Sequence, residues 1–577
     1  MQALDPYAEG DASRMGFWIK GIRVQDGPLI DFPQTGVTLI VGPNNSGKST
    51  LLRQLWRMAR AQRPEPQVLT EVSVGQSGSE ADFIAWLRQF GQLEDGYFRG
   101  SNGDVEARTI AKLWEMKIVA NPSNGGIYDY IVNYADAHER KRRVDAIERR
   151  EVASDPSLMP LHMLESRRDL EVEFSAISLE AFRQAITLDQ TGRTLKLRVG
   201  TVGDSVVLPT NRDGCAELQR LPLLSEQGDG MIFLLGGLLP LVTHTYPVTI
   251  MDEPEAFLHP PQATLMGQKL GALTARGGGQ LVIATHDSNV IRGLLDTPEL
   301  DLKILRLTRH GDDVTVHEVA ADRVRQVAID PLLKHTAILE AYFYRLIVLC
   351  ENERDCVFYR AALSHLALSA PELGVSTHDV LFFPTSGKTN MARVVSVLSD
   401  SGIPIVTSPD LDLLRNYRDV EKLVNSLDGD TKGLNQLWHR ATSGLSQRPI
   451  QRTSKEILAS IESILSTTPN TPPDKDQMSR IREELKTTGD KWHLVAERGT
   501  RAMTSDRQAR DELLNRLGDI GIVLVQVGTL ESFADVDARK DAWLDKALAA
   551  GAHKELPAQE HLRQIIAHLP KDGSMDV

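Results

Sequence analysis

Gly42-Pro43-Asn44-Asn45-Ser46-Gly47-Lys48-Ser49-Thr50 fits the pattern G-x-x-x-x-G-K-[ST] and decides the fold of the first half of the chain. The apolar run 37–41 before it predicts a buried strand, and residues 51–56 after it continue as a helix. In that context two glycines let the backbone approach a triphosphate, and N–H groups at the helix N-terminus face the anion. A glycine-rich turn without a ligand is the alternative, which the flanking strand and helix disfavour.

The loop predicts ATP and Mg²⁺ as ligands. Lys48 supplies a point charge for the phosphates, and the Ser49 hydroxyl can ligate magnesium. The predicted nucleotide-contacting residues of the loop are Gly42, Asn44, Asn45, Ser46, Gly47, Lys48, Ser49 and Thr50.

Two later strands end in residues suited to phosphate chemistry. The apolar run 247–251 leads into Asp252, placed to hold the magnesium through water, and Glu253, placed to orient or deprotonate the attacking water. The strand 280–285 leads into His286, a position from which an imidazole can sense the γ-phosphate. A lone histidine is usually structural. This one follows a strand of the same parallel-sheet pattern, which favours a functional role.

Residues 224–230 directly precede the most apolar window of the chain, 231–242, which is interpreted as a buried helix. A serine before a helix N-terminus can bind the terminal phosphate of a second nucleotide, supplied across a dimer interface. Ser225 is therefore a candidate nucleotide ligand in a homodimer or higher homo-oligomer. The same residue types are also ordinary helix caps, and both interpretations stay open.

Length and composition set the wider limits. A chain of 577 residues needs two or more domains. The formal charge of −13 argues against a coat of nucleic acid or an anionic membrane surface, although a local basic groove remains compatible with it. Three cysteines without a C-x-x-C pair suit a reducing cytoplasm. The N-terminus lacks a signal-peptide pattern, and the window 231–242 is shorter than the ~20 residues that cross a bilayer, so we expect a cytoplasmic protein with no membrane partner.

The second half predicts a small α/β domain with an acidic site of its own. One apolar strand leads into Glu351 and Asp355, and another leads into Asp410 and Asp412. Sites of open parallel sheets form at the carboxyl ends of the strands, so these four carboxylates are expected to converge. They repel one another unless cations lie between them, and oxygen ligands favour Mg²⁺ or Mn²⁺, two of which can support phosphodiester cleavage. The alternative is that surface loops are simply rich in acids.

These patterns divide the chain into a nucleotide-binding domain at 1–334 and a smaller parallel-sheet domain at 335–577. A mainly helical, polar insertion is expected at about 62–223. Within it, the basic run 135–150 is interpreted as a solvated helix face rather than a nucleic-acid contact. A last strand is expected at 521–527.

The order of the first motifs resembles ABC-type ATPases. The stretch 252–260, Asp-Glu-Pro-Glu-Ala-Phe-Leu-His-Pro, is similar to the D-E-P-E-x-x-L-H-P hallmark of the OLD (overcoming lysogenization defect) branch. Like that branch, the segment around Ser225 departs from the transporter signature L-S-G-G-Q. The acids of the second half resemble the Toprim domain, with Asn352 in place of its usual glycine. By the same resemblance, Glu531 in Gly-x-Leu-Glu is an additional candidate metal ligand.

An ABC-type ATPase followed by Toprim is the architecture of OLD-family nucleases, which are related to Gabija and retron antiphage effectors. The resemblance implies an ATP-binding, divalent-metal-dependent endonuclease in antiphage defence. It also implies dimerisation through the ATPase domain, a nucleic-acid substrate with DNA favoured over RNA, and a partner defence protein. The rival hypothesis is a sensor or scaffold ATPase whose Toprim-like domain binds a partner without chemistry. A topoisomerase or primase is less favoured, because no strand-passage or priming module surrounds the acids.

Overall fold

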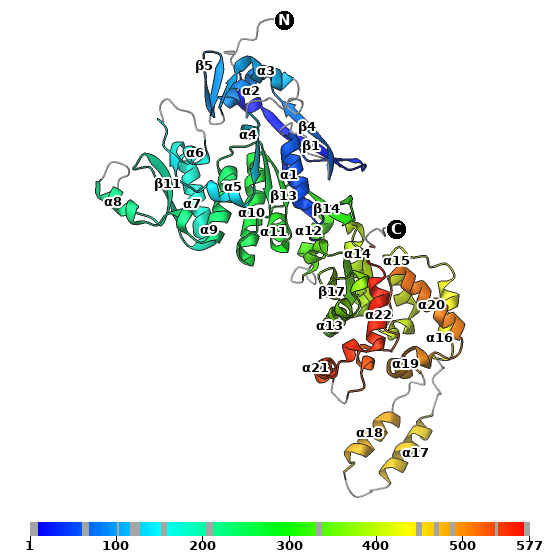
Figure 1. Ribbon diagram of the computed structural model, residues 1–577. Coiled ribbons are helices and arrows are strands. Elements are labelled where there is room, and N and C mark those ends of the chain that lie inside the picture. The colour runs from blue at the N-terminus through cyan, green and yellow to red at the C-terminus, as the bar shows by residue number, and fades with distance from the viewer. Residues whose placement is uncertain are drawn as a thin grey trace. The chain divides into compact units, whose positions relative to one another are not determined.

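The computed structural model forms two compact units (Figure 1). The first comprises residues 1–343, 400–402 and 571–577, and the second comprises residues 344–399 and 403–570. The predicted boundary at 334/335 lies outside the described residues. The residues that the structure describes are 10–59, 68–100, 103–115, 127–151, 159–202, 212–330, 337–445, 453–466, 472–484, 491–536 and 540–570.

A six-stranded sheet organises the first unit, in the order β15-β14-β3-β13-β12-β8. All neighbours pair in parallel except β14 and β15, which are antiparallel. Every residue of β3 is buried, which accounts for its continuous apolar run. Because parallel strands end at one edge, the residues that follow β3, β12 and β13 gather there. The strands are β3 (Gly36–Val41), β8 (Val132–Ala135), β12 (Val248–Asp252), β13 (Gln280–Ala284), β14 (Leu302–His310) and β15 (Asp313–Val319).

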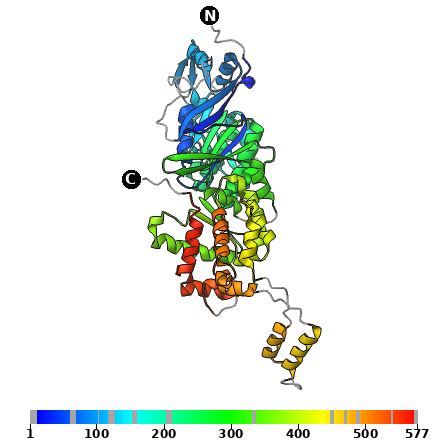
Figure 2. The same ribbon diagram turned by 90° about the vertical axis from the view of Figure 1, so that its right-hand side faces the viewer.

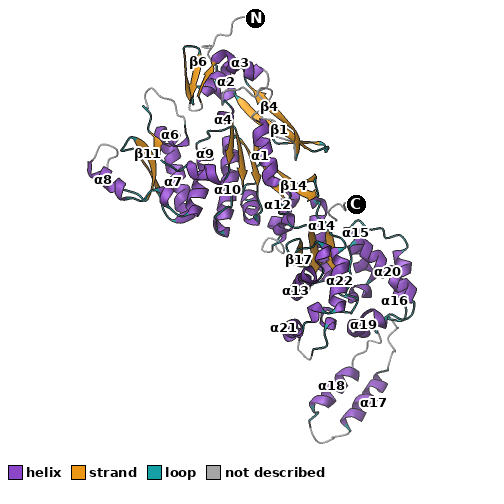
Figure 3. Ribbon diagram, in the orientation of Figure 1, coloured by secondary structure: helices purple, strands orange, loops and turns teal. Residues whose placement is uncertain are grey.

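Helices cover this sheet, as Figure 3 shows. The helix α9 is almost wholly buried, as its apolar window predicted. The helices α10 and α11 pack against each other, and α10 also contacts α9. The helices that follow motif strands are α1 (Lys48–Ala59), α10 (Pro260–Gly277) and α11 (Ser288–Leu295), with α9 (Asp229–Val242) and α12 (Ala321–Ile329) beside them.

A separate antiparallel sheet has the strand order β2-β1-β4. Two of its strands come before the phosphate-binding loop in the chain, and the third comes after it. Its first two strands are β1 (Gly16–Val24) and β2 (Leu29–Asp31). The third strand, β4 (Leu69–Ser77), pairs with β1 over its whole length.

The described part of the insertion at 62–223 contains more helix than strand, but it also contains short strands that the sequence did not predict. One of them, β8, belongs to the central sheet. Their partners lie far away in sequence, so a short local pattern does not announce them. Besides β4 and β8, the strands are β5 (Gly91–Glu94), β6 (Tyr97–Gly100), β7 (Gly103–Glu106), β9 (Ile147–Glu148), β10 (Ile186–Asp189) and β11 (Thr194–Val199). The helices are α2 (Glu80–Leu87), α3 (Ala107–Glu115), α4 (Tyr128–Ile131), α5 (Ala137–Arg142), α6 (Pro160–Ser166), α7 (Arg168–Phe182) and α8 (Arg212–Arg220).

The second unit contains a parallel sheet in the order β17-β16-β18. Its strands are β16 (Leu346–Cys350), β17 (Val380–Pro384) and β18 (Ile405–Ser408), and α13 (Glu353–Ser369) and α14 (Lys388–Leu398) follow the first two. The predicted strand 521–527 forms only isolated parallel bridges, Thr407 with Ile522 and Asp410 with Val525. Those bridges nevertheless extend the sheet beyond β18 and bring the segment before Glu531 to its edge.

Several further helices belong to the second unit. The pair α17 (Ser454–Leu465) and α18 (Lys475–Glu484) packs against itself as a hairpin (Figures 1 and 2). The helix α22 (Leu556–Ile566) packs on α13. The helices α20 (Arg507–Ile520) and α21 (Lys540–Ala550) precede it in the chain. Among the described helices, none is both long enough and apolar enough to span a bilayer.

Candidate functional site

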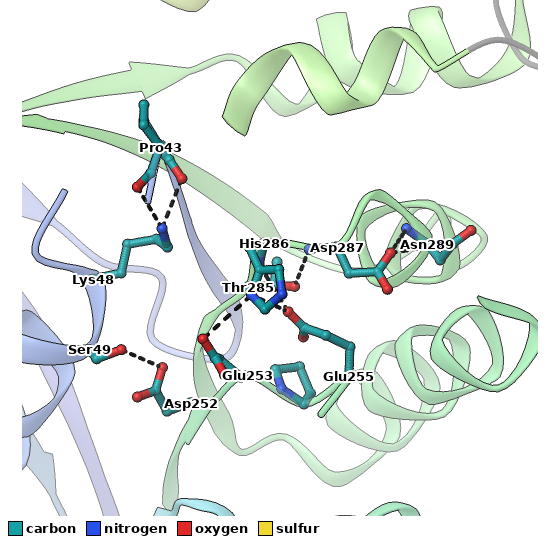
Figure 4. A network of polar contacts seen from close by, with 12 residues as sticks. Pro43, Lys48, Ser49, Asp252, Glu253, Glu255, Thr285, His286, Asp287 and Asn289 are labelled. Carbon is teal, nitrogen blue, oxygen red and sulfur yellow. Dashed lines mark hydrogen bonds and ion pairs between the residues drawn. The ribbon is translucent and has the colours of Figure 1, made fainter. Parts of the chain in front are cut away.

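The loop after β3 is shaped for phosphate. Gly42 has φ +147°, and a Cβ there would lie 2.2 Å from the Leu307 carbonyl oxygen, so this position requires glycine. Gly47 has φ +96°, and the next residue, Lys48, begins α1. The Lys48 Nζ donates to the carbonyl oxygens of Gly42 at 2.8 Å and Pro43 at 2.9 Å (Figure 4). The loop backbone therefore surrounds the amino group of Lys48.

The loop residues fit a nucleotide. Ser46 is 2% exposed, and its Oγ has no hydrogen-bond partner among the described residues, as expected for a donor reserved for a ligand. Burial lowers the pKa of Lys48, while Glu253 and Asp252 oppose that shift. An anion in the loop would offset the cost of burying this ammonium group. Asn44 and Asn45 are exposed, and Asn45 adopts the left-handed conformation at φ +63°.

A serine–aspartate pair joins the loop to β12. The Ser49 Oγ donates to the Asp252 Oδ1 at 3.3 Å. Burial raises the pKa of Asp252, and the hydrogen bond from Ser49 opposes that shift. A hydroxyl and a carboxylate are hard oxygen ligands of the kind Mg²⁺ uses beside a triphosphate, so Ser49 and Asp252 would hold it. Thr50 follows on α1 and is half-buried.

Three side chains after β12 and β13 form an acid–imidazole cluster (Figure 4). The Nδ1 atom of His286 lies 3.5 Å from the Glu253 Oε1 and 3.2 Å from the Glu255 Oε1. Glu255 is 6% exposed and also accepts the backbone N–H of His286 at 2.9 Å. Burial raises the pKa of Glu255, and its hydrogen bond from His286 opposes that shift. Sequence reasoning assigned no role to Glu255, although it stands in the same hallmark stretch as Glu253.

Glu253 itself is held in an uncommon backbone conformation. Its φ of +48° is left-handed, which is rare for a residue with a Cβ. Its N–H donates to the Ala284 carbonyl at 2.9 Å, and its own carbonyl accepts from Arg140 at 3.0 Å. The end of β13 and the helix α5 therefore fix the backbone of Glu253, whose side chain is half exposed. Backbone strain of this kind is concentrated at functional sites.

Arg140 corrects the interpretation of the basic run as a solvated face. Lys141 and Arg142 are exposed, but Arg140 is 1% exposed. From α5 its guanidinium donates to three successive carbonyls, those of Asp252 at 3.2 Å, Glu253 at 3.0 Å and Pro254 at 3.2 Å. Its Cζ also lies 5.3 Å from the ring centroid of Phe233. No local sequence signal distinguishes it from its exposed neighbours.

Ser225 lies in the short 3₁₀ helix Leu224–Glu226, four residues before α9. Gly228 is the N-cap of α9, without a capping side chain. Ser225 is half-buried, and its role opposite a second nucleotide stays a prediction.

The predicted acids of the second unit lie at the carboxyl ends of β16 and β18. The backbone N–H of Asp410 donates to the Glu351 Oε1 at 3.1 Å, which ties the two strand ends together. Burial raises the pKa of Asp410 to about 8, with further contributions from Glu351, Asp355, Asp412 and Glu531. Burial also raises the pKa of Asp355 to about 6 and the pKa of Glu351. The five carboxylates therefore share one electrostatic environment.

Other contacts engage two of these acids. Asp355 caps α13 by accepting the backbone N–H of Asn352 at 2.8 Å. Asp412 pairs with Lys388, whose Nζ lies 2.8 Å from its Oδ1. Within the described ranges, no three His, Cys, Asp or Glu side chains are gathered closely enough to hold a metal ion. The donor chemistry thus fits Mg²⁺, whereas a ready-made cage of ligands is absent from the described residues.

The Asn352 departure from the Toprim pattern has a simple backbone account. Asn352 has φ −137° and ψ 168°, an extended conformation that any residue adopts. A glycine is therefore not required at this turn. Glu351 therefore accepts the hydrogen bond from Asp410 although the next residue is asparagine and not glycine.

Comparisons with known proteins bear on the first unit. Residues 217–292 match a family model described as "AAA domain, putative AbiEii toxin, Type IV TA system". A search of curated proteins gives no match.

Among solved structures, the chain shows similarity at low identity to the following three domains. One is an Smc head bound to the C-winged helix domain of ScpA, with 12% identity over 54% of this chain and 99% of that chain and a TM-score of 0.33. Another is the SMC head domain from Thermotoga maritima, with 16% identity over 53% and 99% and a TM-score of 0.28. The third is the ADP conformation of MJ1267, an ATP-binding cassette of an ABC transporter, with 16% identity over 56% and 96% and a TM-score of 0.25.

The family match and the geometry of the loop agree. The matched segment contains Ser225, Asp252, Glu253 and His286, and the central sheet places the last three beside the phosphate-binding loop. The first unit therefore brings a phosphate-binding loop together with residues of the segment that matches the AAA-domain model.

Proposed function

We propose that the protein is an ATP-dependent endonuclease of the OLD type that cleaves nucleic acid, with DNA favoured over RNA, with the help of Mg²⁺ or Mn²⁺. The observation that carries the proposal is the shared environment of Glu351, Asp355, Asp410, Asp412 and Glu531, in a chain that also has an ATP site. Carboxylates that raise one another's pKa in this way are relieved by divalent cations. Such cations supply an activated water and stabilise the leaving oxygen in phosphodiester hydrolysis.

The residues of the ATP site divide the work of hydrolysis. Lys48 and the loop N–H groups bind the phosphates, and Ser49 and Asp252 hold magnesium. Glu253 orients or deprotonates the attacking water, and His286 responds to the terminal phosphate. Ser225 would contact the nucleotide of a second copy, so the active form is a homodimer or higher homo-oligomer through the first unit. The proposal includes a role in antiphage defence with a partner defence protein, and the matching family description names an AbiEii toxin of a Type IV TA system.

Asp410→Asn tests the nuclease directly. The variant keeps the size of the side chain and the backbone N–H that Glu351 accepts, so the fold is expected to persist. We expect it to lose cleavage of plasmid, linear DNA or transfer RNA by about a hundredfold or more, while its ATPase rate stays within about twofold. The assay measures strand cleavage and phosphate release in parallel, each with and without Mg²⁺, Mn²⁺ and ATP.

The matched control is Asp545→Asn, which changes an exposed aspartate on α21 of the same unit. Its cleavage rate should equal that of the unchanged protein. If Asp410→Asn still cuts at the rate of this control, the acids have no part in the reaction. If the unchanged protein cuts none of the three substrates under any condition, the nuclease proposal fails and only the ATPase remains.

A sensor or scaffold ATPase is the second candidate, and one observation favours it. Lys388 already neutralises Asp412, and the described residues present no assembled metal cage. A scaffold predicts that Mn²⁺ does not bind the second unit. Calorimetric titration of Mn²⁺ into the protein, with Asp410→Asn as reference, separates the candidates, because a nuclease predicts binding that the variant loses.

A further inference from the structure

A second cavity of the first unit lies apart from the phosphate-binding loop. It has a volume of about 520 Å³, which is within the range of small-molecule sites. It lies between α1, β8 and α5, and the residues used below are Trp56, Arg57, Tyr134, Arg142, Arg143 and Tyr246. We refer to it as the side cavity.

Arg143 is the unusual member of its wall. Burial lowers the pKa of its guanidinium, and its Nε and Nη1 have no hydrogen-bond partner among the described residues. Its Nη2 donates to the Asn133 Oδ1, and its Cζ lies 5.8 Å from the ring centroid of Tyr246. Neither contact supplies a negative charge. The nearby carboxylates of Glu139 and Asp136 oppose the lowering of this pKa, but the two nitrogen atoms without a hydrogen-bond partner can still donate to an anion that enters the cavity.

Part of the cavity wall is aromatic. Trp56 and Tyr134 stack with ring centroids 5.3 Å apart and an interplanar angle of 27°. Both rings are half-buried and line the cavity, so a planar ring can extend the stack. Stacking of a base on an aromatic side chain contributes about 1–3 kcal/mol.

Some of the other charged side chains at the cavity pair with each other, and others can contact a ligand. Arg142 pairs with Glu139 at 2.9 Å, and Asp136 accepts the backbone N–H of Glu139 at the start of α5. Arg57 is exposed at the cavity and adds a second cation for an anionic group. The carboxylates of Asp136 and Glu139 also line the cavity and can accept from amino or hydroxyl groups of the same ligand.

We propose that the side cavity binds a free nucleoside monophosphate, with its phosphate toward Arg143 and Arg57 and its base on the Trp56–Tyr134 stack. One ligand of this class presents an anion, a planar ring and hydroxyl donors, which are the three chemistries that the walls accept. None of the residues that line the cavity belongs to the phosphate-binding loop, and the proposal does not depend on nuclease activity.

Calorimetric titration tests the proposal on the full chain, with the ATP site saturated by a non-hydrolysable ATP analogue and Mg²⁺. The titrants are AMP, GMP, CMP, UMP and inorganic phosphate. We expect at least one monophosphate to bind, Arg143→Met to weaken that binding about tenfold or more, and Trp56→Leu to weaken it about threefold or more. Lys141→Met, at an exposed position of α5 that does not line the cavity, should bind within about twofold of the unchanged protein.

Thermal unfolding without ligand separates binding from structure. Arg143→Met removes a cation whose Nε and Nη1 have no hydrogen-bond partner among the described residues, so its unfolding midpoint should equal or exceed that of the unchanged protein. Absence of binding by all four monophosphates would overturn the proposal, as would equal affinity in Arg143→Met or Trp56→Leu. Inorganic phosphate binding as tightly as the best monophosphate would overturn the assignment to a nucleotide.

Discussion

Single side chains set the geometry around the ATP site, and Arg140 is the clearest case. Its guanidinium donates to three consecutive carbonyls from Asp252 to Pro254, so it fixes the backbone of the proposed magnesium ligand and of the proposed catalytic residue Glu253. Hydrogen bonds to a charged group contribute about 1.5–3 kcal/mol each, and part of that stabilisation orients Glu253.

We expect Arg140→Met to lower the rate of ATP hydrolysis about tenfold or more, because 1.4 kcal/mol is a factor of ten in rate. The Kd for ATP should change by less than about threefold, since the loop at Lys48 makes its own contacts. Stopped-flow binding and steady-state phosphate release measure the two quantities. Lys141→Met is the control, and an equal loss of binding and turnover in Arg140→Met would contradict the assigned positioning role.

His561 predicts an acid-sensitive second unit. Its Nε2 lies 2.8 Å from the Ser408 Oγ, and burial lowers its pKa to about 4 from an ordinary value of 6.5. Between these values the unfolded chain binds a proton that the folded chain does not, so stability falls as pH drops from 6.5 toward 4 and is unaffected by this group above 6.5.

Removal of the imidazole in His561→Gln should abolish this component. At pH 5 the unchanged protein should have lost about 2 kcal/mol more of its pH 7 stability than the variant has lost of its own. Urea unfolding at the two pH values measures the difference. Parallel losses in both proteins would show that other groups govern the acid response.

At the scale of elements, the turn from β3 to α1 is the most constrained part of the fold. We expect Gly42→Ala to abolish ATP binding and to lower the midpoint of thermal unfolding, because its Cβ would collide with the Leu307 carbonyl at a left-handed φ. Gly518→Ala is the contrasting change, since α20 leaves open space there. It should stabilise the protein by up to about 1 kcal/mol. Nucleotide binding in Gly42→Ala at the level of Gly518→Ala would refute the requirement.

Elements with strong local patterns could be predicted from the sequence. The buried strands β3, β12 and β13 carry continuous apolar runs, and the acids and His286 follow them directly, so their meeting at one sheet edge follows from parallel pairing. The strand β8 could not be predicted, because four residues beside β12 carry no periodic signal of their own. Arg140 was missed for a related reason, since its partners lie more than a hundred residues away.

The acids of the second unit were predicted in the same way, from strand ends. Asp410 and Glu351 meet through a backbone hydrogen bond, as convergence at one edge requires. The pairing of Lys388 with Asp412 was not predictable, because it joins the start of α14 to a turn after β18. Whether these carboxylates bind metal stays a prediction.

At the scale of the whole molecule, two compact units predict two unfolding events. Calorimetry should resolve two transitions, and MgATP should raise the midpoint of one of them by mass action. Lys48→Ala should remove that shift while leaving the other transition unchanged. A single cooperative transition that moves as a whole with MgATP would show that the units do not unfold independently.

The helix α5 has a mechanical consequence for the molecule. Arg140 donates to the carbonyls of Asp252 and Glu253, the residues proposed to act in hydrolysis. Arg143 lies less than one turn further along, at the C-cap of α5. A rigid segment this short cannot tilt at one end and stay still at the other. We therefore expect that a ligand bound at Arg143 can change the rate of ATP turnover without a change in the conformation of the phosphate-binding loop.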